Sequence, residues 1–287
     1  MFSRVLIAVD GSECARRAAA FGLELASAYG ATVDVLHVVT GDAAGRDVGG
    51  TEVDPRQRGE RFLDDVASSV EGVAVETHLL EGRPGRVIVD QAEERDADLL
   101  VMGRRGRSGL GERLLGSVLE RVLRRTAVPV LAVPETTETA PAGFENVLVT
   151  TDGSDAAELA APYGADLART YAATLHLLTV LDVAKRAGLF DAGGVSAEYV
   201  ERLRAVASED VDALAAAAGD LEGLDVVREV VRGRPHEGIR EYVEGNEVDL
   251  VVMSSQGETR LAGQVLGSVT DRVLRVVRRP VLVVPAP

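Results

Sequence analysis

The chain has 287 residues, a formal net charge of -15 and one cysteine, and 46% of its residues are hydrophobic. This length exceeds one ordinary core and suits two domains of about 140 residues each. The acidic charge and the aromatic content of only 3% argue against a nucleic-acid binder, which needs a basic surface or aromatic platforms. An acid-rich, lysine-poor chain fits either a high-salt cytoplasm or a high-GC genome, so charge alone predicts no function.

The single cysteine, Cys14, rules out an internal disulfide and favours a reducing compartment. We interpret Cys14 as a small buried side chain, because no His or second Cys lies nearby in the sequence to activate it. The N-terminal apolar run from Val5 to Val9 is too short for a signal peptide, and no stretch reaches the ~18 apolar residues of a membrane span. We therefore expect a soluble, cytoplasmic protein with no membrane partner.

In the first half of the chain, short apolar runs alternate with helical periods. The predicted strands are 3–9, 32–39, 73–80, 97–102 and 129–133, and the predicted helices are 12–29, 55–71, 85–95 and 116–126. This order predicts an α/β fold: a doubly wound, five-stranded parallel sheet with helices on both faces and right-handed crossovers. Such sheets bind ligands at the carboxyl ends of their strands, where the strand order reverses.

The second half repeats the first. Arg4–Ser12 recurs as Asn146–Ser154, and Asp98–Met102 recurs as Asp249–Met253. The offset is 142 residues for the first pair and 151 for the second, so the second copy carries a nine-residue insertion. We place this insertion within 182–220, around a longer, Ala-rich helix.

A short polar segment, Glu135–Gly143, bears proline and glycine between the two copies and is typical of a linker. It predicts two tandem domains, 1–138 and 142–287, with the same five-stranded sheet in each.

The loop after the fourth predicted strand carries the strongest indication of function. It contains the glycines Gly103, Gly106, Gly109 and Gly111 and the arginines Arg104, Arg105 and Arg107. The glycines are expected to adopt positive φ and to let the backbone approach a ligand closely. Gly116 and Ser117 then open an amphipathic helix, whose first amides form an anion site. The loop therefore predicts a polyphosphate site.

A structural explanation competes with the ligand for each part of this loop. Ser117 followed by Glu120 is a capping box, which needs no ligand, and for Ser117 alone this explanation is the stronger one. The glycines could serve a long turn and the arginines a solvated loop. The spacing of the whole segment after a buried strand favours phosphate.

Three features resemble the universal stress protein family in its tandem form. The first strand ends in Asp10-Gly-Ser12, and the loop reads Gly103-x-x-Gly106-x9-Gly116-Ser117, which is the family's ATP-binding pattern. Each copy also closes with a Pro-Val-Leu strand. The resemblance covers essentially the whole chain. It implies Rossmann-like, adenine nucleotide alpha hydrolase-like domains.

The resemblance also implies that the first domain binds ATP with Mg²⁺. The residues implied to contact the nucleotide are Ala8, Val9, Asp10, Val38, Met102, Gly103, Arg104, Gly106, Gly116, Ser117 and Val118. Asp10 is implied to lie near the ribose or a phosphate-bound Mg²⁺, although it could instead cap the first helix, as Ser12 could equally well.

The second domain departs from the pattern, because Ser254 replaces the first glycine of the loop. If Gly103 is needed for positive φ or close approach, this replacement costs affinity. We therefore expect a weaker or empty second site. Its positions are Asp152, Val180, Met253, Ser254, Gly257, Gly267, Ser268 and Val269.

No dedicated catalytic constellation is visible. The turn after the first strand lacks Gly-x-Gly-x-x-Gly, and the residue before Ser117 is glycine where a P-loop has lysine, so slow ATP hydrolysis is the most we expect. The four histidines lack metal-like spacing, and His37 and His236 are expected to make structural hydrogen bonds. We therefore predict a non-enzymatic, ATP-dependent regulatory switch; the alternative is a nucleotide-independent scaffold or interaction protein.

The closing strands also bear on assembly. Val130–Val133 and Val281–Val284 are short, apolar and expected at sheet edges, where exposure favours pairing. By the family resemblance, the two domains are expected to pair through these strands about a pseudo-twofold axis, and a homodimer of chains is a further possibility.

Overall fold

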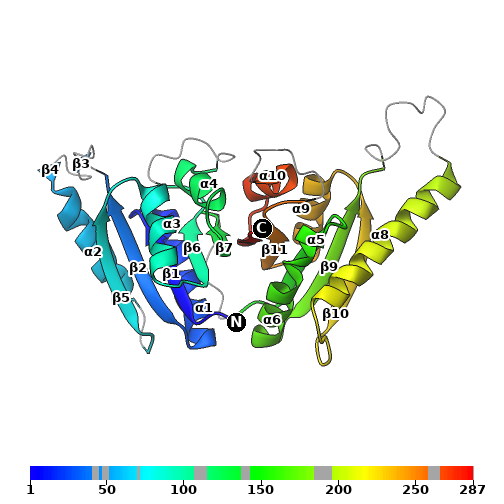
Figure 1. The fold of residues 1–287 in the computed structure, drawn as a ribbon, viewed down its shortest axis with the longest axis horizontal. Coiled ribbons are helices and arrows are strands. Elements are labelled where there is room, and N and C mark those ends of the chain that lie inside the picture. Colours follow the sequence, from blue (N-terminus) through cyan, green and yellow to red (C-terminus); the bar gives the residue numbers. More distant parts are fainter. Residues whose placement is uncertain are drawn as a thin grey trace. The chain divides into compact units, whose positions relative to one another are not determined.

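The computed structural model describes residues 1–40, 45–46, 52–69, 72–106, 115–136, 143–183, 196–257 and 266–286. The chain divides into two compact units, Met1–Gly143 and Phe144–Pro287. Each unit is an α/β domain, as Figure 1 shows.

The elements of the first unit follow the predicted order closely. They are β1 (Arg4–Val9), α1 (Glu13–Tyr29), β2 (Thr32–Val39), α2 (Pro55–Ala67), β5 (Val75–Glu81), α3 (Pro84–Glu94), β6 (Leu99–Gly103), α4 (Ser117–Leu123) and β7 (Val130–Val133). A short antiparallel pair, β3 (Gly45–Arg46) with β4 (Glu52–Val53), precedes α2 and was not predicted.

The second unit repeats this order. Its elements are β8 (Asn146–Thr151), α5 (Asp155–Glu158), α6 (Ala161–Tyr171), β9 (Thr174–Leu181), α8 (Ala197–Ala217), β10 (Val226–Arg232), α9 (Pro235–Gly245), β11 (Leu250–Ser254), α10 (Ser268–Val276) and β12 (Val281–Val284).

Each unit builds one parallel sheet. The strand order is β5-β2-β1-β6-β7 in the first unit and β10-β9-β8-β11-β12 in the second. The chain runs outward from β1 to β5 and then returns to the other side of β1, so the strand order reverses between β1 and β6. The loops after β1 and β6 therefore diverge at the switch point where parallel sheets bind ligands. This confirms the predicted fold class.

Helix α1 packs on β1 and β6, and α2 packs on β2 and β5. The serine Ser12 begins α1, and Gly30, at φ 63°, ends it in the left-handed conformation that favours glycine. Helix α1 also needs glycine in its interior, because a Cβ on Gly22 would lie 2.7 Å from Cδ1 of Ile7. Burial of the Ile7 side chain, which is fully covered, contributes about 1.5–3 kcal/mol. The cores are thus built from aliphatic strands covered by close helices.

The second unit differs from the first in two helices. Where the first unit has the single helix α1, the second has α5 and α6, and Pro162 stands in the first turn of α6. Proline has no amide hydrogen to bond the preceding turn, which explains the break after Glu158. Helix α8 has 21 residues and the corresponding α2 has 13, which locates most of the nine-residue insertion in this helix.

Candidate functional site

The turn after the first strand has the same construction in both units. Oδ1 of Asp10 accepts a hydrogen bond from the amide of Ser12 at 3.0 Å, and Oγ of Ser12 accepts one from the amide of Ala15 at 3.1 Å. Ser12 is therefore the cap of α1, and Asp10 stabilises the turn before it. Between them Gly11 has φ 79°, which a side chain would make unfavourable.

The corresponding turn of the second unit repeats these contacts. Oδ1 of Asp152 accepts from the amide of Ser154 at 3.2 Å and from its hydroxyl at 2.6 Å. Oγ of Ser154 in turn accepts from the amide of Ala157 at 3.2 Å, and Gly153 has φ 84°. In both turns the serine, and not the aspartate, caps the helix that follows.

The motif glycines of the β6 loop serve close packing within the chain. Gly103 and Gly106 have ordinary φ, so the expectation of positive φ was wrong for them, and Gly116 also has ordinary φ. A Cβ on Gly103 would lie 3.0 Å from the carbonyl carbon of Cys14, at the start of α1. A Cβ on Gly106 would lie 2.5 Å from Oδ2 of Asp10. Glycine here lets the loop, the start of α1 and the Asp10 carboxylate converge. Gly109 and Gly111 lie outside the described residues.

A backbone hydrogen bond closes the base of this loop in each unit. The amide of Gly116 donates to the carbonyl oxygen of Arg104 at 3.0 Å, and the amide of Gly267 donates to that of Ser255 at 2.7 Å. A Cβ on Gly116 would lie 3.0 Å from the same Arg104 oxygen, so glycine is required for this closure. The amide of Gly116 is therefore committed to the loop, which leaves anion binding to the residues that follow.

Ser117 is the first residue of α4 and does not cap it. The cap is Gly116, at φ −64° and ψ 136°, and it has no side chain to bond the first amides. The capping-box explanation of Ser117 is therefore wrong. Ser117 is exposed, and the amides of Ser117 and Val118 belong to the first turn, where a helix provides no carbonyl partner. Ser268 and Val269 stand in the same positions of α10, after the cap Gly267.

The two described arginines of the first loop, Arg104 and Arg105, do not form an open cluster. Arg104 is 6% exposed, and burial lowers the pKa of its guanidinium to about 9. Nη1 of Arg105 lies 3.7 Å from a carboxylate oxygen of Glu135. Arg107 lies outside the described residues. The backbone of Arg104 shapes the loop, but its buried side chain is poorly placed for a solvent-exposed phosphate.

The positions implied for the adenine lie together at the ends of β1, β2 and β6. Ala8 pairs with Met102 across β1 and β6, and Val9 pairs with His37 across β1 and β2. Val38 follows His37 in β2 and is partly exposed. Nδ1 of His37 lies 2.8 Å from the carbonyl oxygen of Val9, so the expected structural role of His37 is confirmed. Ala8 and Val9 are buried, so Val38 is the partly exposed member of this aliphatic group beside the Asp10 turn.

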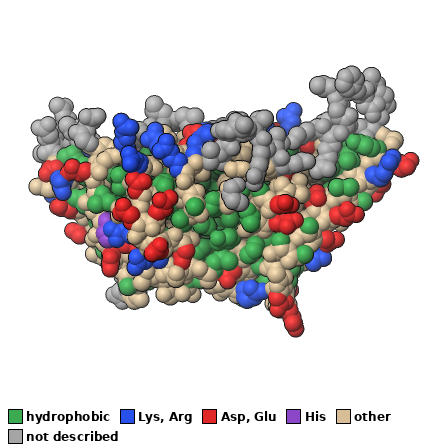
Figure 2. Space-filling view, in the orientation of Figure 1, with side chains coloured by type: hydrophobic (Ala, Val, Ile, Leu, Met, Phe, Trp, Pro, Cys, Tyr) green, Lys and Arg blue, Asp and Glu red, His purple; other side chains and the backbone are tan. Residues whose placement is uncertain are grey.

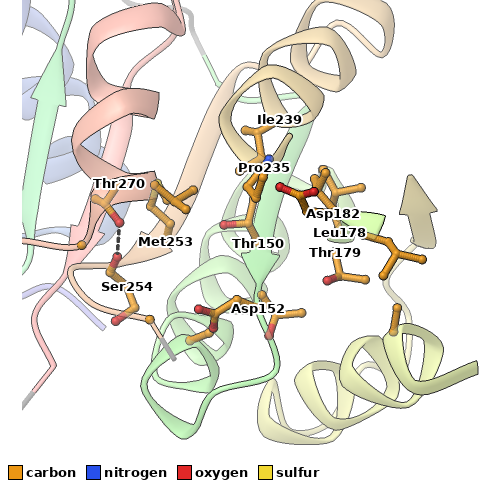
Figure 3. Close-up of a pocket in the computed structure, with 18 of the residues that line it drawn as sticks. Thr150, Asp152, Leu178, Thr179, Asp182, Pro235, Ile239, Met253, Ser254 and Thr270 are labelled. Atoms are coloured by element: carbon orange, nitrogen blue, oxygen red, sulfur yellow. Dashed lines mark hydrogen bonds between the residues drawn. The ribbon is translucent and has the colours of Figure 1, made fainter. Parts of the chain in front are cut away.

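The second unit contains a formed cavity of about 480 Å³ at the corresponding place. Figure 3 shows its labelled side chains around one open space, with Asp152 and Asp182 among them. All eight positions predicted for the second site line this cavity: Asp152, Val180, Met253, Ser254, Gly257, Gly267, Ser268 and Val269. The replacement of glycine by Ser254 has therefore not filled the site.

Sequence reasoning missed several lining residues. Tyr199, Leu203 and Ala207 come from α8, and Pro235 and Ile239 come from α9. The others are Thr150, Thr151, Ala157, Leu178, Thr179, Leu181, Asp182, Gln256 and Thr270. The nine-residue insertion was the signal for the α8 wall. In the alignment of the two repeats, two threonines replace Ala8 and Val9. This replacement was the signal that the cavity has polar lining residues at the end of β8.

An ionic cluster around the buried Asp34 lies away from these sites in the first unit. Asp34, Glu76 and His78 bring possible metal ligands within 4.8 Å of one another. However, Oδ1 of Asp34 lies 2.7 Å from Nε2 of His78 and 3.3 Å from Nη1 of Arg95, and Nε of Arg4 lies 3.8 Å from Oδ2. Two guanidinium groups beside the carboxylate oppose a divalent cation, so we interpret the cluster as an ion-pair network.

The remaining reactive candidate, Cys14, is buried as expected. Its thiol donates to the carbonyl oxygen of Val133 at 3.2 Å, and burial raises its pKa. Among the described helices, none is both long and apolar enough to cross a membrane. On the face shown in Figure 2, acidic side chains are scattered among basic and hydrophobic ones, in keeping with the charge of -15.

Comparison with known proteins covers both units. The universal stress protein family matches residues 1–134 and 143–285. A universal stress protein of Mycobacterium tuberculosis is 30% identical over 97% of this chain and 96% of its own length. One from Mycolicibacterium smegmatis is 28% identical over 98% of this chain and 96% of its own length. The crystal structure of a universal stress protein from Archaeoglobus fulgidus has a TM-score of 0.70 at 25% identity and covers 98% of this chain and 96% of that one. The chain belongs to the universal stress protein family.

Proposed function

We propose that this protein is a cytoplasmic regulator that binds ATP with Mg²⁺ in its first unit. The observation that carries the proposal is the convergence of Asp10, Gly106 and the first turn of α4 at the switch point of the sheet. In a parallel sheet this is the expected place for a nucleotide. The first loop keeps every glycine of the pattern, which supports the first unit over the second as the ATP site.

The described residues fit a nucleotide from base to phosphate. The partly exposed Val38, beside the buried Ala8 and Val9, would suit an adenine ring, which gains from apolar contact. By the family resemblance, the backbone from Met102 to Gly106 would line the ribose and the phosphates. The amides of Ser117 and Val118, in the uncapped first turn of α4, then offer donors to anionic oxygens.

Asp10 is the residue that fits a metal ion in this arrangement. Ser12 caps α1, and the Oδ2 atom of Asp10 faces the loop at Gly106. A carboxylate at the edge of a phosphate site suits Mg²⁺, which commonly takes one or two carboxylates together with phosphate oxygens. When bound, Mg²⁺ would neutralise phosphate charge beside Asp10.

We infer a binding switch and not a dedicated catalyst. ATP in this site would bridge Gly106, the first turn of α4 and Asp10, and this bridging would change what the protein can bind. No lysine precedes Ser117 to stabilise a transferring phosphate, so any turnover is expected to be slow. The pairing of the two units through Val130–Val133 and Val281–Val284, and a homodimer, remain predictions.

The competing proposal is a scaffold that keeps the fold without the ligand. Absorbance of freshly purified protein separates the two, because a chain with five Tyr and no Trp absorbs weakly at 280 nm. Bound nucleotide would raise the ratio of absorbance at 260 nm to that at 280 nm, and chromatography of the acid extract would identify it. Protein that carries no nucleotide and shows no heat of binding with Mg·ATP would support the scaffold.

A further inference from the structure

The cavity of the second unit is lined differently from the first site, although the positions correspond. Thr150 and Thr151 stand where the first unit has Ala8 and Val9, and Thr179 stands where it has His37. These hydroxyls add hydrogen-bonding groups along the floor of the cavity, at the carboxyl ends of β8 and β9. The second site therefore favours a more polar ligand surface than the aliphatic first site does.

Further replacements change the rim. Gln256 stands where the first loop has Arg105, and Asp182 stands where β2 is followed by Thr40. The described lining residues include the carboxylates of Asp152 and Asp182 and no lysine, arginine or histidine. Asp152 corresponds to Asp10 of the first unit, so Asp182 is the added carboxylate, and among the described lining residues no basic side chain offsets its charge beside a triphosphate. This rim disfavours polyanions.

The apolar part of the site is retained. Leu178, Val180 and Met253 correspond to Leu36, Val38 and Met102 of the first unit and line the cavity with Ile239. The longer helix α8 adds Tyr199 and Leu203 as a second wall. An aromatic ring and aliphatic side chains in the same lining suit a flat heterocycle, because its faces gain from apolar contact. Figure 3 shows Leu178, Thr179 and Met253 around the same space.

We propose that the second unit binds an uncharged nucleoside and discriminates against the corresponding triphosphate. The flat base lies against the aliphatic surface under Tyr199, and the sugar hydroxyls exchange hydrogen bonds with the threonine hydroxyls and Asp152. The cavity of about 480 Å³ falls in the usual range for small-molecule sites and is large enough for a nucleoside. This inference rests on the proposed function in one respect, because it assumes that both units recognise a nucleoside framework.

Titration calorimetry of the full chain with adenosine, AMP and Mg·ATP tests the proposal. We expect adenosine to bind the second unit, and we expect this binding to weaken about tenfold in Thr179→Val, through the loss of one net hydrogen bond. Thr174→Val is the matched control, because Thr174 begins β9 at the opposite end of the strand and does not line the cavity. Tyr199→Ala, in a partly exposed position, tests the wall independently of the buried Thr179.

The variants also separate this inference from the proposed function. Asp182→Thr, which installs the residue of the first unit, is expected to improve Mg·ATP binding at the second site. Adenosine binding that is unchanged by Thr179→Val and Tyr199→Ala but lost in the first-unit variant Gly106→Ala would overturn the nucleoside site and leave the ATP proposal standing. Equal affinity of the second unit for Mg·ATP and adenosine would do the same. A chain that binds adenosine through Thr179 but never binds Mg·ATP would overturn the ATP proposal alone.

Discussion

The carboxylate of Asp10 lies so close to Gly106 that a methyl group on Gly106 would stand 2.5 Å from Oδ2. The second unit repeats this relationship, with 2.1 Å between a Cβ on Gly257 and Oδ2 of Asp152. The two loops at the switch point of each sheet therefore meet at a carboxylate and a glycine. This contact explains why glycine occupies these positions, since their φ angles are ordinary.

Gly106→Ala is predicted to displace the Asp10 carboxylate and leave the fold intact, because the crowded atom is the end of a side chain. We expect Mg·ATP affinity to fall about tenfold, equivalent to about 1.4 kcal/mol, as measured by calorimetry. Gly245→Ala is the control, because a Cβ there meets nothing within 4 Å. A Gly106→Ala variant with wild-type affinity would show that the Asp10 position is irrelevant to binding.

Ser12→Ala and Ser117→Ala are predicted to have opposite consequences. Ser12 caps α1, so its loss is expected to lower the free energy of unfolding by about 1 kcal/mol. Ser117 caps nothing, so its loss should leave the urea midpoint nearly unchanged and weaken Mg·ATP binding. A destabilised Ser117→Ala variant with normal affinity would assign Ser117 a structural role instead.

Gly103→Ser copies the residue of the second unit and is predicted to destabilise the first by about 1–3 kcal/mol through overpacking. The new Cβ would lie 3.0 Å from the carbonyl carbon of Cys14 and 3.1 Å from the amide nitrogen of Ala15, both backbone atoms. Urea unfolding measures the cost. A Gly103→Ser variant as stable as the wild type would mean that α1 moves aside easily. Close packing would then not explain why position 103 is a glycine.

Acid is predicted to destabilise the second unit through His176. Burial lowers the pKa of this imidazole, although the charge of Glu229 opposes the shift, and its ring nitrogens contact Tyr242 and Asn146. A histidine whose pKa in the folded protein lies below its usual 6.5 binds fewer protons in the folded state than in the unfolded state. The free energy of unfolding is therefore not reduced by this histidine above pH 6.5, and it decreases as the pH falls below that value. Urea midpoints should decline less steeply between pH 7.5 and pH 5 in His176→Gln, and identical slopes would contradict this.

Cys14 is predicted to resist thiol reagents in the native state, because it is 3% exposed and burial raises its pKa. Reaction with a chromogenic disulfide should be slow in buffer and should release one equivalent in urea. Rapid modification of the folded protein would place the start of α1 in a more open arrangement.

Most of the fold could be predicted from sequence because its signals are local. The strand predicted at 32–39 is found at Thr32–Val39, and the helix predicted from 55 begins at Pro55 but ends at Ala67, four residues early. The short β3–β4 pair was missed because two-residue strands carry no periodicity.

The site was predicted less completely, because its geometry depends on contacts between distant segments. Spacing identified Gly103, Gly106 and Gly116, but only the structure shows that they face Cys14, Asp10 and the Arg104 carbonyl. The capping role assigned to Ser117 failed because α4 begins at Ser117 itself, one residue earlier than a Ser117 cap requires, and this leaves Gly116 as the cap. The cavity walls from α8 and α9 lie outside the motif in the sequence, and only the α8 wall had a signal, the nine-residue insertion.

The most direct test of the central claim is a crystal structure of the full chain grown with Mg·ATP. Density for a triphosphate should run from the loop at Gly106 to the amides of Ser117 and Val118, with Mg²⁺ beside Asp10. A first unit without nucleotide, with these groups covered by the chain's own side chains, would contradict the account.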